Sequence, residues 1–82
     1  MIVSAQISIY PLRQTRLGPA VESVRATLAE HGLTAKVGSM STIVVGEDRA
    51  IFGALADAFA KAAESGEVVM TVTVSNACPI PD

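Results

Sequence analysis

The chain has 82 residues, of which half are apolar and only 17% are charged, with a formal net charge of -2. Its six lysine and arginine residues are scattered and form no basic stripe, which argues against a nucleic-acid surface. No apolar run is long enough to cross a bilayer, and the opening "MIVSAQISIYPL" lacks the basic region of a signal peptide. We therefore expect one small cytoplasmic domain over residues 1–82, without membrane insertion.

The first and last strands are indicated by alternation of apolar and polar residues. In residues 2–10 the positions that point toward a core are Val3, Ala5, Ile7 and Ile9. Pro11 follows and ends this strand. In residues 68–75 three valines and a methionine point toward the core, and the other side carries Val69, Thr71, Thr73 and Ser75.

A helix and a hairpin follow the first strand. The helix begins at Pro19, repeats valine and leucine at helical spacing, and ends at His31 and Gly32, where glycine suits a left-handed cap. The hairpin joins residues 33–37 to residues 42–47 through the turn "GSMS". The first of its strands is expected to point inward with Leu33, Ala35 and Val37.

A second helix follows the hairpin directly, with Asp48 placed to cap it and Gly66 placed to end it. Its apolar stripe consists of Ile51, Phe52, Leu55, Phe59 and Ala62. The resulting order is βαββαβ. A split βαβ arrangement then gives an antiparallel four-stranded sheet in the order 4-1-3-2, with both helices on one face. The sequence therefore predicts an α+β sandwich.

Helices on one side leave the other face of the sheet open. By alternation we assign to this open face Gln6, Ser8, Tyr10, Thr42, Val44, Thr71, Thr73 and Ser75. A plain solvated face or an oligomer interface is the simpler interpretation. However, short hydroxyls, an amide and a phenol with hardly a charge suit a surface that is covered by another subunit or by a flat polar ligand. Glu47 stands at the rim of this face.

Catalytic and metal-binding patterns are missing from the sequence. His31 and Cys78 are the only histidine and cysteine, so neither a thiol–imidazole pair nor a metal site is favoured. Glu47 and Asp48 are adjacent, but acidic residues at the start of a helix are explained by its dipole. The loop after the first strand has neither the CxxC pair of a metal carrier nor the glycines of an acylphosphatase phosphate loop. This leaves a binding or assembly role.

Three segments resemble a known family: "ISIYPL" ends the first strand, "STIVVGE" spans the third, and "TVTVSNACP" closes the chain. They are similar to the YkoF-like thiamine/hydroxymethylpyrimidine-binding proteins and to the small thiamine-binding proteins of the same superfamily. The resemblance implies a ferredoxin-like fold that pairs into homodimers or homotetramers. It also implies non-catalytic binding of thiamine or its hydroxymethylpyrimidine precursor in uptake or salvage. Proteins of the YkoF type carry two such domains, so here a homodimer has to supply the second.

The open face and the three motifs together give the residues expected to bind the ligand: Gln6, Ser8, Tyr10, Ser41, Thr42, Glu47, Thr73, Ser75 and Asn76. Their chemistry is compatible with an aminopyrimidine, because an amide and hydroxyls serve as donors or acceptors and Glu47 accepts from the exocyclic amine. Tyr10 offers a ring face to a cationic thiazolium. We expect no catalytic residue, no metal ion and no cofactor.

Two alternatives stay open at this point. One is a structural or regulatory oligomerisation module that buries the open face without a small-molecule ligand. The other is a small dimeric αβ-barrel enzyme, for which the chain offers mainly Glu47 and Tyr10. A small domain with an uncharged face is expected to form at least a dimer, through the open face or an edge strand. If the open face is covered, Thr73→Lys should weaken assembly or binding by roughly 1–3 kcal/mol.

Overall fold

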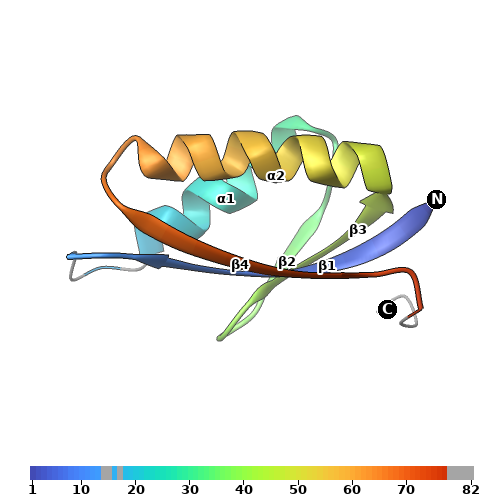
Figure 1. Ribbon diagram of the computed structural model, residues 1–82, viewed down its shortest axis with the longest axis horizontal. Helices are drawn as coiled ribbons and strands as arrows, with labels where there is room; N and C mark the ends of the chain where they lie inside the picture. The colour runs from blue at the N-terminus through green and yellow to red at the C-terminus, as the bar shows by residue number, and fades with distance from the viewer. Residues whose placement is uncertain (14–15, 17, 78–82) are drawn as a thin grey trace.

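The computed structural model describes residues 1–13, 16 and 18–77. Within these residues the elements are β1 (Ile2–Pro11), α1 (Gly18–Glu30), β2 (Ala35–Val37), β3 (Thr42–Glu47), α2 (Asp48–Ala63) and β4 (Val68–Ser75). The strands form one antiparallel sheet in the order β2-β3-β1-β4. Both helices cover the same face of this sheet (Figure 1). The predicted βαββαβ order, strand order and ferredoxin-like α+β fold are confirmed.

β1 lies at the centre of the sheet and supplies much of the core. Its alternation is as predicted, because its buried side chains are Val3, Ala5, Ile7 and Ile9. β4 follows it without interruption of the register, from Ser4 opposite Ser75 to Pro11 opposite Val68. The helix side of β4 packs against the same core through Val68, Met70, Val72 and Val74. The predicted faces of both strands are therefore correct.

The assignment of β3 to the two faces of the sheet is wrong. Thr42 and Val44 were expected on the open face, but they are 5% and 1% exposed and belong to the helix side. The register gives the reason, because directly opposed residues of antiparallel strands share a face. Thr42 lies opposite the buried Ile7, and Val44 lies opposite the buried Ala5. The side chains of β3 that share the open face are Ile43, Val45 and Glu47.

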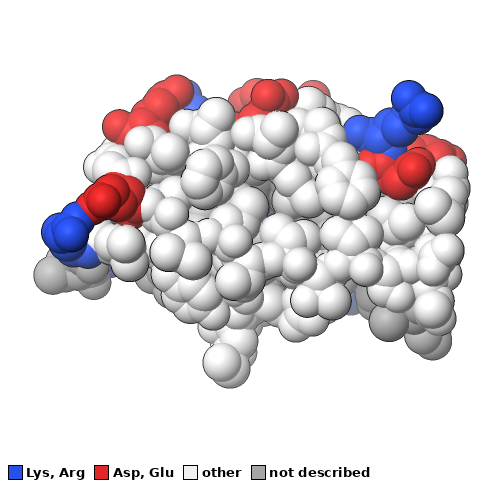
Figure 2. All heavy atoms as spheres, in the orientation of Figure 1, with Lys and Arg blue, Asp and Glu red and all other residues white. Residues whose placement is uncertain are grey.

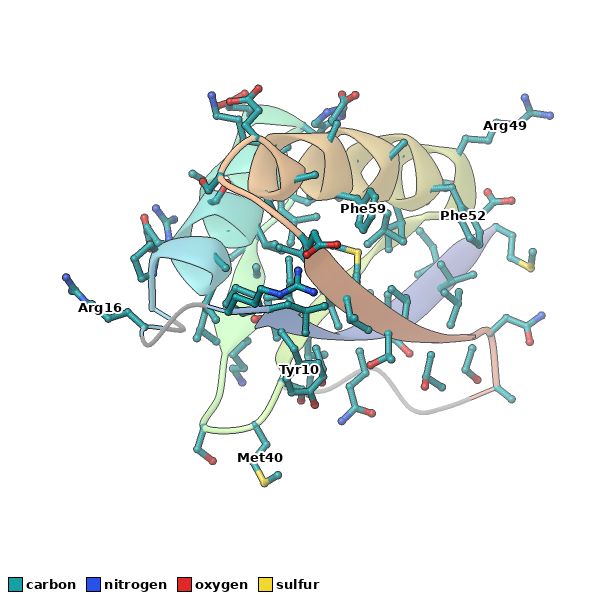
Figure 3. The ribbon with its side chains drawn as sticks, turned by 60° about the vertical axis from the view of Figure 1, so that its left-hand side comes forward. Tyr10, Arg16, Met40, Arg49, Phe52 and Phe59 are labelled. Carbon is teal, nitrogen blue, oxygen red and sulfur yellow. The ribbon has the colours of Figure 1, made fainter. Side chains whose placement is uncertain are left out.

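The buried stripe of α2 also differs from the prediction. Its buried residues are Ile51, Ala54, Leu55, Ala58 and Ala62. Phe52 and Phe59, which were expected among them, are 56% and 44% exposed and project from the side of the helix (Figure 3). The alanines keep α2 close to its neighbours, and just before α2 Gly46 permits a close approach of the Leu33 side chain. A Cβ atom on Gly46 would lie only 2.7 Å from Cδ2 of Leu33.

The remaining corrections concern the ends of elements. Asp48 is the first residue of α2 rather than its cap, and the cap residue Glu47 makes no side-chain capping bond. β2 begins only at Ala35, and Val37, which was expected in the core, is exposed. Gly32 ends α1 with a φ of 76°, as predicted. An acidic residue in the first turn of α2 is still favourable, because it faces the positive end of the helix dipole.

Two further points bear on the sequence-based expectations. Cys78 and the prolines that follow it lie outside the described residues. None of the helices that the structure describes is long and apolar enough to cross a membrane.

Candidate ligand-binding site

The two central strands, β1 and β3, differ in length, and a cavity lies beside β1 just before the first residue of the shorter strand β3. β1 pairs with β4 as far as Pro11, but with β3 only as far as Ile7, which lies opposite Thr42. Residues 38–41, the β2–β3 hairpin, stand beside the rest of β1. The space between β1, α1 and this hairpin is a cavity of about 210 Å³.

The cavity combines an apolar wall with a set of hydroxyl groups. The apolar wall comes from β1 and α1 and consists of Ile7, Ile9, Val21 and Val24. The hydroxyl-bearing residues that line the cavity are Ser8, Tyr10, Ser39, Ser41 and Thr42. Gly38 and Met40 complete the hairpin side. No charged side chain belongs to the described lining, so the cavity suits a neutral ring with a few polar atoms better than a compact ion.

Hydrogen bonds hold the hairpin against β1. Ser8 Oγ donates to the backbone carbonyl of Met40 at 3.2 Å. Gln6 Nε2 donates to Ser41 Oγ at 3.1 Å. Within the hairpin, the Gly38 amide donates to the Ser41 carbonyl at 2.8 Å. The polar rim of the cavity is therefore positioned by two strands, while the tip of the hairpin at Met40 projects into solvent (Figure 3).

The structure divides the nine residues predicted to bind a ligand. Those that line the cavity are Ser8, Tyr10, Ser41 and Thr42. Gln6 adjoins the cavity through its bond to Ser41. Thr42 lines the cavity from the helix side of the sheet rather than from the open face, where it was expected.

The other predicted residues lie away from the cavity. Thr73 is opposite Gln6 on the open face, and Ser75 is opposite Ser4 near the beginning of β1. Asn76 Nδ2 contacts Sδ of Met1 at 3.3 Å. Glu47 is opposite Ile2 at the same end of the sheet. Ser75, Asn76 and Glu47 lie toward the other end of β1 from the cavity, so one small ligand does not reach both. Thr73 lies beside Gln6 in the middle of the sheet and does not line the cavity.

Glu47 is engaged by the amino group of Met1. The amine donates to Glu47 Oε2 at 2.8 Å and to Asp48 Oδ1 at 3.4 Å. The hydrogen bond to Glu47, helped by the charge of Asp48, raises the pKa of the amine above its ordinary value of 8.0. The acidic rim that was expected to attract a cationic ligand is thus already paired in this chain.

We expect Glu47→Gln to lower the pKa of the Met1 amine toward its ordinary value and to leave ligand binding unchanged. The amide keeps the shape of the side chain but removes the negative charge that favours the protonated amine. An NMR titration of the amine gives the pKa, and Asp48→Asn is the matched control with the smaller expected shift. Loss of ligand binding in Glu47→Gln would show that Glu47 belongs to the site after all.

Sequence reasoning missed the part of the cavity that α1 and the hairpin tip provide. Val21 and Val24 were recognised only as an apolar repeat of a helix, and Ser39 and Met40 only as a turn. The hydroxyl groups of "GSMS" next to Thr42 were the available signal. What the sequence did not indicate is that the hairpin stands beside the end of β1.

The histidine and carboxylate side chains of the described residues are not grouped around the cavity. The described residues contain no cluster of histidine, cysteine or carboxylate side chains that could hold a metal ion. His31 lies just beyond α1, as predicted for a helix-end residue, and its Nε2 is 2.8 Å from Asp57 Oδ2 of α2. This pair joins the end of α1 to α2, and it does not line the cavity.

Comparison with protein families identifies the chain. The family described as the YKOF-related family matches residues 2–81. The chain belongs to the YKOF-related family. The resemblance noted in the three sequence motifs is thereby confirmed. No curated protein matches the chain.

Solved structures of distant sequence share the fold. The hypothetical protein MJ1052 of Methanocaldococcus jannascii is 20% identical with a TM-score of 0.85, covering 98% of this chain and 84% of that protein. SP2199 of Streptococcus pneumoniae is 23% identical with a TM-score of 0.82, covering 92% and 86%. TM0486 of Thermotoga maritima, named as a candidate thiamine biosynthesis/salvage protein, is 18% identical with a TM-score of 0.79, covering 90% and 82%. At these identities the similarity establishes the fold alone.

Proposed function

We propose that this chain binds hydroxymethylpyrimidine, either free or as the pyrimidine half of thiamine, in the cavity between β1, α1 and the hairpin. The observation that carries the proposal is the cavity itself, an apolar slot of about 210 Å³ bordered by hydroxyls. Membership of the YKOF-related family supports the ligand class, and so does the name of the structurally similar TM0486.

The size of the cavity favours one ring over two. Pockets for drug-sized ligands measure roughly 300–1,000 Å³, and this cavity is smaller. We expect a substituted pyrimidine ring to lie against Ile7, Ile9 and Val24, with the thiazolium of thiamine outside the cavity. The uncharged lining agrees with this orientation, because burying the cationic ring in it would leave the charge without a partner.

The polar groups of the cavity match the edge of an aminopyrimidine. The ring nitrogens of such a ligand are acceptors and its exocyclic amine is a donor. Hydroxyl groups rotate and act either as hydrogen-bond donors or as acceptors, so Thr42, Ser41 and Tyr10 are able to pair with both kinds of ligand atom. Met40 and Ser39 contribute backbone groups at the hairpin. We therefore assign recognition to hydroxyls and backbone, with no part for Glu47.

We propose binding without chemical conversion, in thiamine uptake or salvage. The described lining carries hydroxyls but neither a carboxylate nor an imidazole, the groups that most often transfer protons in catalysis. The proposal includes a homo-oligomer, a homodimer or homotetramer, because a domain of this size gains stability from area buried against a copy of itself. The cytoplasmic location expected from the sequence stays a prediction.

Calorimetric titration tests the proposal. We expect hydroxymethylpyrimidine and thiamine to release heat at sub-millimolar concentration, and the isolated thiazole alcohol to release none, because the pyrimidine occupies the cavity. Comparable binding of the thiazole alone would contradict the proposed orientation. The absence of heat and of any thermal shift with millimolar pyrimidine or thiamine would reject the ligand class.

The second candidate function is an oligomerisation module of structural or regulatory kind, with no small-molecule ligand. One observation favours it, namely the wide uncharged surface over β4 and the adjoining side of α2, where Phe52 and Phe59 are exposed. The same titration separates the two candidates, because a module of this kind self-associates and does not respond to pyrimidine or thiamine.

A further inference from the structure

The cavity meets β1 at the edge of the strand rather than on one of its two faces. Four consecutive residues of β1 line it, namely Ile7, Ser8, Ile9 and Tyr10. Neighbouring side chains of a strand point to opposite faces. Accordingly Ile7 and Ile9 are buried on the helix side, whereas Tyr10 is exposed on the other side. A cavity that contacts all four residues therefore borders the edge of β1, which is where backbone hydrogen-bonding groups point.

The backbone groups of Ile9 point toward this edge. On the β4 side of β1, the Leu12 amide donates to the Glu67 carbonyl at 2.8 Å. On the β3 side, the Asp48 amide donates to the Met1 carbonyl at 2.9 Å. Successive residues of an antiparallel strand direct their backbone groups to alternate neighbours, and both registers are unbroken. Even-numbered residues of β1 thus bond to β4 and odd-numbered ones to β3, so the amide and the carbonyl of Ile9 both face the β3 side.

β3 does not extend far enough to pair with Ile9. The last pair of the β1–β3 ladder is Ile7 with Thr42, so the position opposite Ile9 falls on Met40. Met40 belongs to the turn of the hairpin, which a backbone bond between residues 38 and 41 closes at 2.8 Å. Its side chain projects into solvent (Figure 3). The chain therefore turns at the position where one more residue of β3 would have paired with Ile9.

The donor and acceptor of the Ile9 backbone have no partner among the described residues. The Met40 carbonyl, which lies opposite, accepts from Ser8 Oγ at 3.2 Å. No hydrogen bond between described residues ends on the amide or on the carbonyl of Ile9. Buried backbone groups are nearly always paired, either within the protein or with water. This donor–acceptor pair beside the cavity is therefore available to a ligand.

The neutral character of the cavity makes this backbone pair important for recognition. The described lining contains no charged side chain, and Figure 2 shows none on the hairpin that projects at the lower edge of the view. A ligand is thus held by neutral dipoles. Hydroxyl groups rotate and pair with either kind of ligand atom, whereas the Ile9 groups are fixed in direction by the sheet. They require one acceptor and one donor, next to each other, on the ligand.

We propose that the amide and the carbonyl of Ile9 recognise a planar heterocycle that carries an exocyclic amine next to a ring nitrogen. The amine donates to the Ile9 carbonyl, and the ring nitrogen accepts from the Ile9 amide. An amide donor and a carbonyl acceptor pair in the same way with the amine and ring nitrogen of adenine in DNA recognition. The ring thus takes the place in the sheet that one more residue of β3 would have occupied.

This inference rests on the proposed function and names the part of the ligand that decides its specificity. Hydroxymethylpyrimidine carries the required amine next to a ring nitrogen, and so does the pyrimidine half of thiamine. The side chain of Ile9 supplies part of the apolar wall, while its backbone supplies the directional contacts. One residue of β1 therefore contributes to both the affinity and the selectivity of the cavity.

The oxo analogue of hydroxymethylpyrimidine, in which an oxygen replaces the amine and the neighbouring ring nitrogen carries a hydrogen, tests the inference. The size of the ring hardly changes, but donor and acceptor exchange places. We expect calorimetric titration to show binding weaker by about 100-fold or more, because both Ile9 groups then face groups of their own kind. Equal affinity would overturn the inference and leave the proposed function standing. Failure of hydroxymethylpyrimidine itself to bind would reject both.

Hydrogen exchange at the Ile9 amide, followed by NMR, tests the location of the contact. The matched control is the Ile7 amide, which points the same way but is paired with Thr42. In the free protein we expect Ile9 to exchange much faster than Ile7. At a hydroxymethylpyrimidine concentration about ten times the dissociation constant, exchange at Ile9 should slow about tenfold, because only the ligand-free fraction exchanges.

Three exchange results would contradict the assignment of the contact to Ile9. One is an Ile9 amide that is already as protected as Ile7 in the free protein, since it would have a partner within the chain. Another is an Ile9 amide that stays unprotected when the ligand is bound. The third is equal slowing of Ile7 and Ile9, which would indicate a general stabilisation of the sheet in place of a direct contact.

Discussion

Thr42→Val should weaken hydroxymethylpyrimidine binding by about 10- to 100-fold, the loss expected when a buried polar atom of the ligand is left without its partner. Thr42 is 5% exposed and lines the cavity between β1 and the hairpin. Valine has nearly the same shape, so the volume of the cavity is preserved and only the hydroxyl is lost. Calorimetric titration of the variant gives the change in affinity.

Thr27→Val is the matched control for this change. Thr27 is the other buried threonine among the described residues, at 6% exposure, and its Oγ1 donates to the Ser23 carbonyl within α1 at 2.9 Å. Removing this hydroxyl affects the helix but not the cavity lining, so we expect unchanged affinity. Equal losses in both variants would indicate a general loosening of the fold, and an unaffected Thr42→Val would remove Thr42 from the site.

Ile51→Ala should lower the free energy of unfolding by about 2–5 kcal/mol, the range for truncating a fully buried aliphatic side chain. Ile51 is 0% exposed and is the first large side chain that α2 places in the core. Small domains have only about 5–15 kcal/mol of total stability, so this change removes a large share. Urea denaturation measures the effect.

Phe52→Ala, at the next position, is the informative comparison. Phe52 is larger than Ile51 but 56% exposed, so we expect its free energy of unfolding to change by no more than about 0.5 kcal/mol, as for an ordinary surface position. A loss comparable to that of Ile51→Ala would mean that Phe52 belongs to the core, as its position in the apolar stripe first indicated.

The α2 stripe illustrates what the sequence is able to predict. Eleven of the sixteen residues of α2 are alanine, isoleucine, leucine or phenylalanine, so periodicity alone selects no single face, and the large rings look like natural core residues. The helix instead packs through Ala54 and Ala58, because small side chains allow close contact with its neighbours. The element types, in contrast, followed from alternation and from residues such as Pro11 and Gly32 that end an element locally. The strand order then followed from the split βαβ arrangement of these elements.

The faces of β3 and the cavity show the limit of local patterns. Three consecutive branched residues, Ile43 to Val45, allow either face to be buried, and only the pairing of Thr42 with Ile7 decides between them. The cavity arises because β1 continues beyond this pair while the hairpin stands beside it. It depends on the relative lengths of two strands that meet only in the folded chain. Most of the hydroxyl residues, with the exception of Ser39, were therefore predictable, whereas their grouping was not.

An NMR titration of ¹⁵N-labelled protein with hydroxymethylpyrimidine tests the central claim most directly, because it reports both whether the ligand binds and where. We expect saturable shifts of the backbone amides of Ser8 to Tyr10 and of residues 38–42, with little change in Thr71 to Asn76. Shifts confined to Thr73, Ser75, Asn76 and Glu47, or no shifts at millimolar ligand, would contradict the placement of the site in the cavity.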